Sequence, residues 1–209
     1  MSNSMSPEIS IDPHPLLDVV TFSAQWDQPL GTVETPPELV AALTHEGENR
    51  RDDETKGAVR RMLRHGGYRP AGRGKPASEY LVAASEKGIL SPINAVVDGC
   101  NASSLWGGLP ISVVDADLLH GELRIAIAAE GASYVFNRTG QEITLTGLLC
   151  LHDEEGPCAN AVKDAQRTKT HEETRAVRIV VWGSTELPGR AAEVAEVYRG
   201  WLERAGGSV

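Results

Sequence analysis

The sequence has few cysteines and no long hydrophobic run. Its three cysteines, Cys100, Cys150 and Cys158, are odd in number and show no Cys-x-x-Cys spacing. A disulfide framework or a structural zinc site is therefore not expected, and a reducing cytoplasm is the simplest setting. No apolar run reaches the roughly 18 residues that a membrane-spanning helix needs, so no membrane partner is expected. The first residues also lack the basic and apolar regions of a signal peptide.

The short motifs that identify common enzyme classes are missing as well. There is no dinucleotide-binding or Walker-A glycine loop, no His-Glu-x-x-His and no Gly-x-Ser-x-Gly. We therefore expect neither a cofactor nor a bound metal ion. Residues 152–155 read His-Asp-Glu-Glu and have metal-ligand side chains, but adjacent acids before a Gly-Pro turn are more often simply solvated.

The net charge of −9 argues against nonspecific binding to nucleic acids, and DNA is not an expected partner. One segment has the opposite charge: residues 56–75 contain seven Lys or Arg and no acid. Arginine can bind phosphate oxygens through two parallel hydrogen bonds, and glycine allows the backbone to approach a phosphate closely. The alternative is a solvated basic helix and turn that pair with acids elsewhere. The candidate phosphate ligands are Arg61, Arg64, Arg69, Arg73 and Lys75.

The length of 209 residues fits one domain, with a hydrophobic content of 41% and a charged content of 23%. Residues 1–14 are expected to form a flexible polar arm and residues 15–209 a single domain. After a first strand at 16–26, hydrophobic periodicity predicts helices at 38–44, 54–65, 79–87 and 91–107. Short strands are expected at 111–114, 123–128, 133–137, 142–145, 148–152 and 176–182, before a last helix at 189–205. Because helices come mostly first and last, the pattern favours an α+β fold over a doubly wound sheet.

Two polar clusters are candidate binding sites. Residues 156–170 are dense in polar side chains and lie between two predicted strands, where loops often carry binding chemistry. An ordinary solvated loop is the alternative. Asn94, Asp98 and Asn101 recur at helical spacing, which predicts that they share one helix face.

The order of these motifs resembles the B3/B4 domain of the phenylalanyl-tRNA synthetase β chain, and more closely the free-standing relatives of that domain. The resemblance covers residues 14–205 and implies a central mixed β-sheet with a barrel-like core, flanked by helices at both ends of the chain. No single motif is diagnostic, and the resemblance rests on the order in which the motifs occur. The matching positions are Pro92, Asn94, Val97, Asp98, Asn101, Ser104, Leu105, Leu109, Pro110, Asp115, Asp117, Lys163, Asp164, Thr168, Lys169, Glu173 and Thr174.

In the synthetases this domain hydrolyses tyrosine that has been wrongly esterified to the phenylalanine tRNA. The resemblance therefore implies a deacylase acting in trans on a mischarged or non-standard aminoacyl-tRNA. Two positions depart from the bacterial pattern, because Ser112 and Val180 stand where a pocket His and a pocket Glu are expected. The tyrosine-reading pocket is thus not expected to be kept. The chain itself is too short to include the aminoacylation machinery.

Ester hydrolysis needs a positioned water and a stabilised oxyanion. We expect Asn101 or Asn160 to position the water and Lys163 to lie near the developing negative charge. Asp164 would bind the α-ammonium group of the substrate. Two other functions remain open. The fold could hold an amino acid, an aminoacyl carrier or an RNA end without chemistry, or it could be a purely structural interaction domain. The candidate substrate-binding residues are Asn94, Asp98, Ser104, Asp164, Gln166, Thr168 and Lys169.

Overall fold

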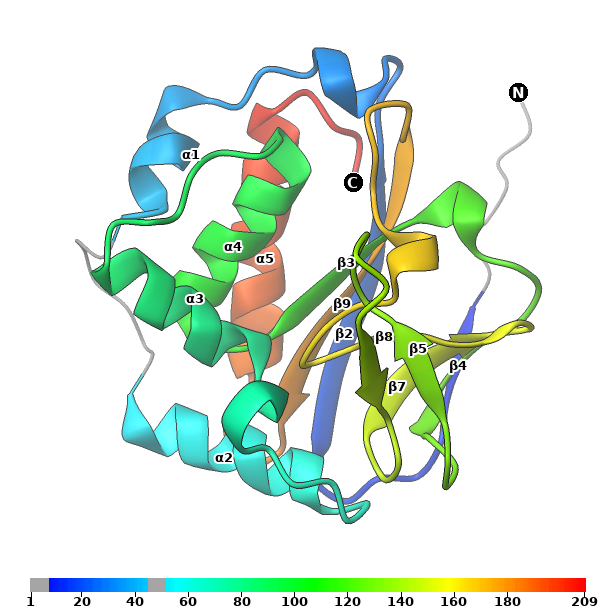
Figure 1. Ribbon diagram of the computed structural model, residues 1–209. Helices are drawn as coiled ribbons and strands as arrows, with labels where there is room; N and C mark the ends of the chain where they lie inside the picture. The colour runs from blue at the N-terminus through cyan, green and yellow to red at the C-terminus, as the bar shows by residue number, and fades with distance from the viewer. Residues whose placement is uncertain (1–7, 45–51) are drawn as a thin grey trace.

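The computed structural model describes residues 8–44 and 52–209. Helices cover one face of a three-stranded sheet, and a second sheet lies against its other face (Figure 1). The helices are α1 (Pro37–Ala42), α2 (Asp53–Arg64), α3 (Ala77–Glu86), α4 (Ala95–Gly107) and α5 (Arg190–Arg204). Short 3-10 turns are η1 (Leu30–Thr32), η2 (Gly72–Gly74), η3 (Ala116–Leu118) and η4 (Gln166–Thr168).

The three-stranded sheet has the order β2 (Leu17–Gln25), β9 (Ala176–Ser184), β3 (Ile111–Asp115), with the central strand antiparallel to both neighbours. Residues 177–184 of β9 are all buried. A strand covered on both faces needs apolar side chains at successive positions, which explains the unbroken run from Ile179 to Trp182. The sheet is therefore the centre of the core.

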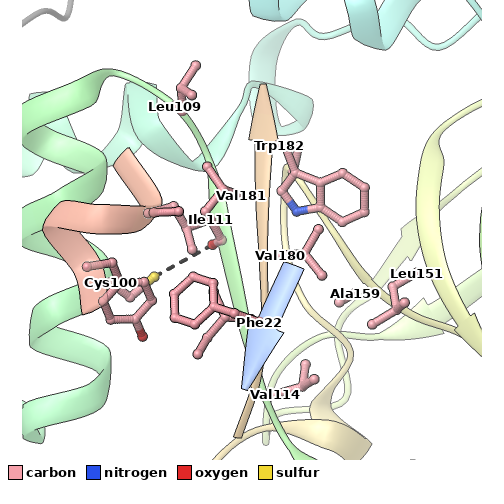
Figure 2. Close-up of a cluster of buried hydrophobic side chains, with 14 of the residues drawn as sticks. Phe22, Cys100, Leu109, Ile111, Val114, Leu151, Ala159, Val180, Val181 and Trp182 are labelled. Atoms are coloured by element: carbon pink, nitrogen blue, oxygen red, sulfur yellow. Dashed lines mark hydrogen bonds between the residues drawn. The ribbon is translucent and has the colours of Figure 1, made fainter. Parts of the chain in front are cut away.

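Side chains of β9 alternate between the two layers (Figure 2). Val181 faces the helices together with Phe22 and Ile111, while Val180 and Trp182 face the second sheet. Trp182 is fully buried. Glycines let α4 approach α5 closely, because a Cβ atom at Gly107 would lie 2.1 Å from a methyl carbon of Val194.

The second sheet has the order β1 (Ile9–Ile11), β4 (Leu123–Ile127), β7 (Leu149–Asp153), β8 (Gly156–Asn160). Its first pair is parallel and the others are antiparallel. A separate hairpin is formed by β5 (Ser133–Val135) and β6 (Glu142–Thr144). The α+β prediction is confirmed, with helices before and after the strands. A closed barrel is not formed by the described strands, because β8 packs on β3 through side chains without forming a ladder.

Two predicted segments differ from the structure. Strand β1 lies within the arm that the sequence predicts to be flexible, and it pairs with β4 from Ile9 to Ile11; residues 1–7 lie outside the described residues. Strand β8 occupies the start of the predicted polar loop at 156–170. The Gly-Pro pair at its start and the asparagine at its end are typical of a turn, but Cys158 and Ala159 between them are fully buried in a strand.

Over the described residues, no helix combines the length and apolarity required to cross a membrane.

Candidate functional site

A cavity of about 1070 Å³ opens between α3, α4 and the β5–β6 hairpin. One wall comes from the two helices, and the other comes from the hairpin and its turn. The turn after β8 and the residues around η2 complete the lining. The lining residues are Arg73, Gly74, Ala77, Tyr80, Leu81, Ala84, Cys100, Asn101, Ser104, Ile111, Phe136, Gln141, Glu142, Ile143, Thr144, Val162 and Lys163.

Asn101 and Lys163, two predicted catalytic residues, both line this cavity. Helix α4 carries Asn101, and the turn after β8 carries Lys163. The ammonium nitrogen of Lys163 lies 4.0 Å from the centre of the Phe136 ring, within cation–π range. Burial lowers the pKa of Lys163, and the nearby charge of Arg73 lowers it further. The structure therefore brings an amide and a partly desolvated cation into one cavity.

Asn160, the third predicted catalytic residue, shapes the turn instead of lining the cavity. Its Oδ1 accepts hydrogen bonds from the backbone N–H groups of Val162, at 2.8 Å, and Lys163, at 3.0 Å. Its Nδ2 donates to the hydroxyl of Tyr134, which in turn donates to the carbonyl of Lys163 at 2.5 Å. The side chain is only 2% exposed. Asn160 thus has no polar atom left for a water in the cavity.

Asp164 lies behind the cavity, not in its lining. Its Oδ1 accepts from the Ser112 hydroxyl at 2.7 Å and from the Asn160 backbone N–H at 3.1 Å. Burial raises the pKa of its carboxyl to about 6. The predicted contact of Asp164 with a substrate ammonium is not supported, because Asp164 is absent from the cavity lining and its Oδ1 already accepts two hydrogen bonds.

The helix face predicted from Asn94, Asp98 and Asn101 divides into separate roles. Asn94 is the N-cap of α4 and accepts from the N–H groups of residues 96 and 97. Asp98 is buried and accepts from the N–H of Ile93 at 2.9 Å and the hydroxyl of Thr35 at 3.2 Å. Both therefore fix the start of the helix and leave Asn101 to face the cavity.

The remaining predicted substrate-binding residues mostly support the backbone. Ser104 lines the cavity, but its hydroxyl donates to the Leu109 carbonyl at 2.7 Å. Thr168 is buried and donates to the Cys158 carbonyl at 3.1 Å. The ammonium group of Lys169 donates to the Phe136 carbonyl at 2.6 Å and so ties the hairpin to η4. Gln166 begins η4 and lies outside the lining.

Of the five candidate phosphate ligands, only Arg73 is among the described residues that line the cavity. Arg61 forms a surface ion pair with Glu186 at 2.8 Å, as the alternative of pairing with acids predicts. Arg64 and Arg69 are exposed, and Lys75 is half-buried. The basic segment at 56–75 therefore contributes one of these five side chains to the cavity, and its charges do not form a continuous basic surface along it.

The hairpin residues Phe136, Gln141, Glu142 and Thr144 were not predicted as site residues. In the sequence they form an ordinary strand–turn–strand stretch with no polar cluster. They line the cavity because the hairpin lies opposite α3 in the fold. Local sequence patterns do not predict which distant elements face each other. Tyr80 was missed for the same reason.

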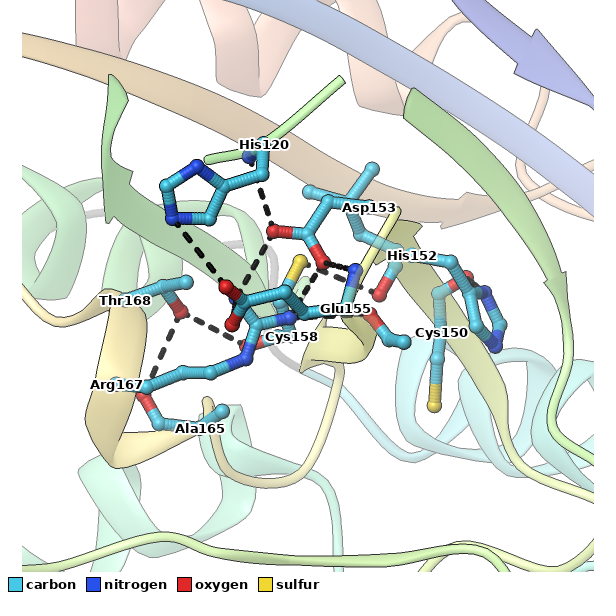
Figure 3. Close-up of polar contacts among 11 residues, drawn as sticks. His120, Cys150, His152, Asp153, Glu155, Cys158, Ala165, Arg167 and Thr168 are labelled. Carbon is cyan, nitrogen blue, oxygen red and sulfur yellow. Dashed lines mark hydrogen bonds and ion pairs between the residues drawn. The ribbon is translucent and has the colours of Figure 1, made fainter. Parts of the chain in front are cut away.

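The acidic run at 152–155 forms a compact ion-pair cluster (Figure 3). The guanidinium of Arg167 binds both carboxylate oxygens of Asp153, at 2.9 and 2.6 Å. His120 lies 3.5 Å from a carboxylate oxygen of Glu155. Across the described part of the chain, no group of three or more His, Cys, Asp or Glu is arranged to hold a metal ion.

Comparison with known proteins adds independent information. Residues 72–187 match the family described as the B3/4 domain. The phenylalanine–tRNA ligase beta subunit of Bartonella quintana (strain Toulouse) is 34% identical over 121 residues, which cover 55% of this chain and 15% of that protein. The chain thus spans a small part of that relative's length.

A solved N-terminal fragment of the phenylalanyl-tRNA synthetase beta subunit from Pyrococcus horikoshii aligns with a TM-score of 0.48 and 15% identity, over 56% of this chain and 42% of that one. The family match, by contrast, extends over more than half of the chain and includes α3, α4 and the whole hairpin. The chain belongs to the B3/4 domain family.

Proposed function

We propose that this chain is an editing-type hydrolase that cleaves the ester of a mischarged or non-standard aminoacyl-tRNA. The observation that carries the proposal is the meeting of Asn101 and Lys163 in one cavity, with Arg73 beside them. The family relation to a tRNA ligase subunit supports the substrate class. The buried free thiols of the chain support action in a reducing cytoplasm.

Each residue has a distinct role in this proposal. The Asn101 amide positions the attacking water, and the Lys163 ammonium group stabilises the negative charge that develops on the carbonyl oxygen. Among the described lining residues, Glu142 is the one acid, and it replaces Asp164 as the partner of the substrate ammonium. Removing a single group that stabilises the transition state typically lowers turnover about 100-fold or more.

Deacylation of a panel of mischarged tRNAs tests the proposal. We expect turnover on at least one of them, and we expect Asn101→Ala to lower that turnover about 100-fold. Lys163→Gln should act similarly, while Lys87→Gln, at an exposed lysine outside the cavity, should leave turnover unchanged. Folded protein without turnover on any substrate would contradict hydrolysis.

A second candidate function is binding of an aminoacyl group or an RNA end without turnover. It is favoured by the packing around the two positions at which the chain departs from the synthetase pattern. Ser112 and Val180 are cross-strand partners on β3 and β9, and they are 1% and 0% exposed. The Trp182 indole donates to the Ser112 hydroxyl at 2.9 Å, so these positions belong to the core. Binding that weakens steeply with salt and occurs without hydrolysis would support this candidate with RNA as its ligand.

A further inference from the structure

The cavity between α3, α4 and the hairpin has a polar mouth and a deeply buried floor. Side chains at the mouth, such as Glu142, are exposed to solvent. A lining side chain that is almost wholly buried lies at the bottom of a cavity, and four lining residues fit this description. These residues, which we call the floor, are Cys100 (7% exposed), Ser104 (1%), Ile111 (8%) and Val162 (2%).

The polar groups of the floor already have partners within the protein. The Ser104 hydroxyl donates to a backbone carbonyl at 2.7 Å, and the Cys100 thiol donates to the Ile111 carbonyl at 3.7 Å (Figure 2). The backbone N–H of Val162 donates to the Asn160 side chain at 2.8 Å. A polar ligand group that reached the floor would therefore lose its water partners and find no unused donor in these groups.

Cys100 is a neutral, apolar part of the floor and not a nucleophile. Burial raises the pKa of its thiol, and the charge of Asp164 raises it further. The thiolate, which is the reactive form of cysteine, is therefore disfavoured at neutral pH. A buried free cysteine packs as a small hydrophobic side chain, so Cys100 extends the apolar surface made by Ile111 and Val162.

The floor lies next to the two groups that the proposed function assigns to the reacting ester. Asn101 follows Cys100 on α4, and Lys163 follows Val162 in the turn after β8. Asn101 and Lys163 are half-buried, whereas the residues before them are buried, so each pair runs from the floor towards the mouth. In an amino acid ester the side chain is attached to the carbon beside the reacting carbonyl. An ester held at Asn101 and Lys163 therefore has its side chain within reach of the floor.

We propose that the floor binds the side chain of the aminoacyl group and selects an apolar one, with Cys100, Ile111 and Val162 as specificity-determining residues. The inference rests on the proposed function for the location of the reacting ester. It is the opposite of the tyrosine preference of the synthetase domain, since these groups offer no unused donor to a phenol hydroxyl. Ser112 and Val180, at the positions of the pocket His and Glu of the bacterial pattern, are buried in the core and lie outside the described lining.

Calorimetric binding of non-hydrolysable analogues tests this selection. Each analogue carries an amino acid in amide linkage to the 3′ position of adenosine, and the analogues form two pairs matched in shape: leucyl with asparaginyl, and valyl with threonyl. Burying an unpaired amide or hydroxyl lowers affinity, so we expect the leucyl and valyl analogues to bind about ten- to hundredfold more tightly than their partners. Equal or reversed affinities in either pair, or no binding of any analogue, would overturn the inference.

Two cysteine variants compare the floor with a site away from it. Cys100→Ser places a hydroxyl, which can accept a hydrogen bond, at the floor. Cys150→Ser makes the same change at a buried thiol outside the lining and is the matched control. We expect Cys100→Ser to reduce the leucyl-to-asparaginyl affinity ratio about three- to tenfold and Cys150→Ser to leave it unchanged.

Val162→Thr provides a second variant of the floor in case Cys100→Ser does not fold, and thermal midpoints show which variants are folded. It adds a hydroxyl with almost no change in shape, so we expect the same reduction of the affinity ratio. An unchanged ratio in the folded floor variants, or an equal reduction in Cys150→Ser, would overturn the inference.

Turnover measurements separate this inference from the proposed function. Preferential binding of the leucyl analogue without deacylation of any mischarged tRNA would contradict hydrolysis and leave the apolar selection standing. Deacylation at equal rates of one tRNA charged with leucine or with asparagine would support hydrolysis and overturn the selection.

Discussion

Two asparagines that look equally suited to catalysis in the sequence should behave differently when each is changed to alanine. Asn160 is 2% exposed, and its side chain satisfies the backbone N–H groups of Val162 and Lys163 as well as the Tyr134 hydroxyl. Asn101 is half-buried and lines the cavity. The same substitution therefore removes a turn-forming network in one case and a ligand-facing amide in the other.

The expected cost at Asn160 follows from the donors it leaves behind. Each buried donor without a partner costs about 1–3 kcal/mol, so two N–H groups, one of them partly solvated, give about 2–4 kcal/mol. At Asn101 water replaces the lost contacts, and the change should stay within about 0.5 kcal/mol. Urea unfolding monitored by tryptophan fluorescence measures both values.

The two variants also separate stability from function. Asn101→Ala should keep the unfolding midpoint and lose turnover or binding, whereas Asn160→Ala should lower the midpoint and also disturb Lys163. The reasoning is refuted if Asn160→Ala costs no more free energy than Asn101→Ala. That result would mean that the turn after β8 does not depend on the Asn160 side chain.

Two further predictions concern carboxylates that other side chains hold in place, the half-buried Asp164 and the buried Asp153. The pKa of Asp164 is raised from 3.8 to about 6 in the folded chain. Between these pH values the folded state keeps a proton on Asp164 that the unfolded state has lost. The free energy of unfolding therefore falls by about 3 kcal/mol as the pH rises from about 4 to 6. Asp164→Asn should flatten this slope in urea titrations across that range; an unchanged slope would contradict the assignment. Arg167→Gln should cost about 2–4 kcal/mol of unfolding free energy, since it leaves the fully buried Asp153 carboxylate unpaired while Arg167 itself is 30% exposed. Arg124→Gln breaks an exposed pair with Asp12 and should cost much less than Arg167→Gln, because solvent screens an exposed pair; equal losses would refute the role of burial.

The sequence predicts most of the helices and strands because their signals are local. The basic face and the glycine stop of α2 mark its length, and the apolar run of β9 marks a central strand. Strand β8 was missed because its signal is not local. Asn160 is a residue type that usually marks a turn, and here it ends a buried strand. Its side-chain amide donates to the hydroxyl of Tyr134, which lies 26 residues away in the sequence.

The ordered set of residues that carries the family resemblance describes a framework more than a site. Asn94 caps α4, and the Thr174 hydroxyl donates to the buried Asp115 carboxylate. Asp164 joins β3 to the turn after β8 through Ser112. Such contacts specify the fold, which explains why the family and the α+β class are predictable from sequence. The walls of the cavity are not predictable in this way, because they join α3 to a hairpin that begins more than 40 residues later.

The independence of the β5–β6 hairpin has a consequence for how this domain can change over evolution. The hairpin pairs with neither large sheet, and the hydrogen bonds of Tyr134 and Lys169 help to tie it to the segment after β8. Insertions or substitutions between residues 136 and 142 would reshape one wall of the cavity without breaking a ladder of either large sheet. New ligand preferences can therefore arise at this turn while the rest of the chain keeps its fold.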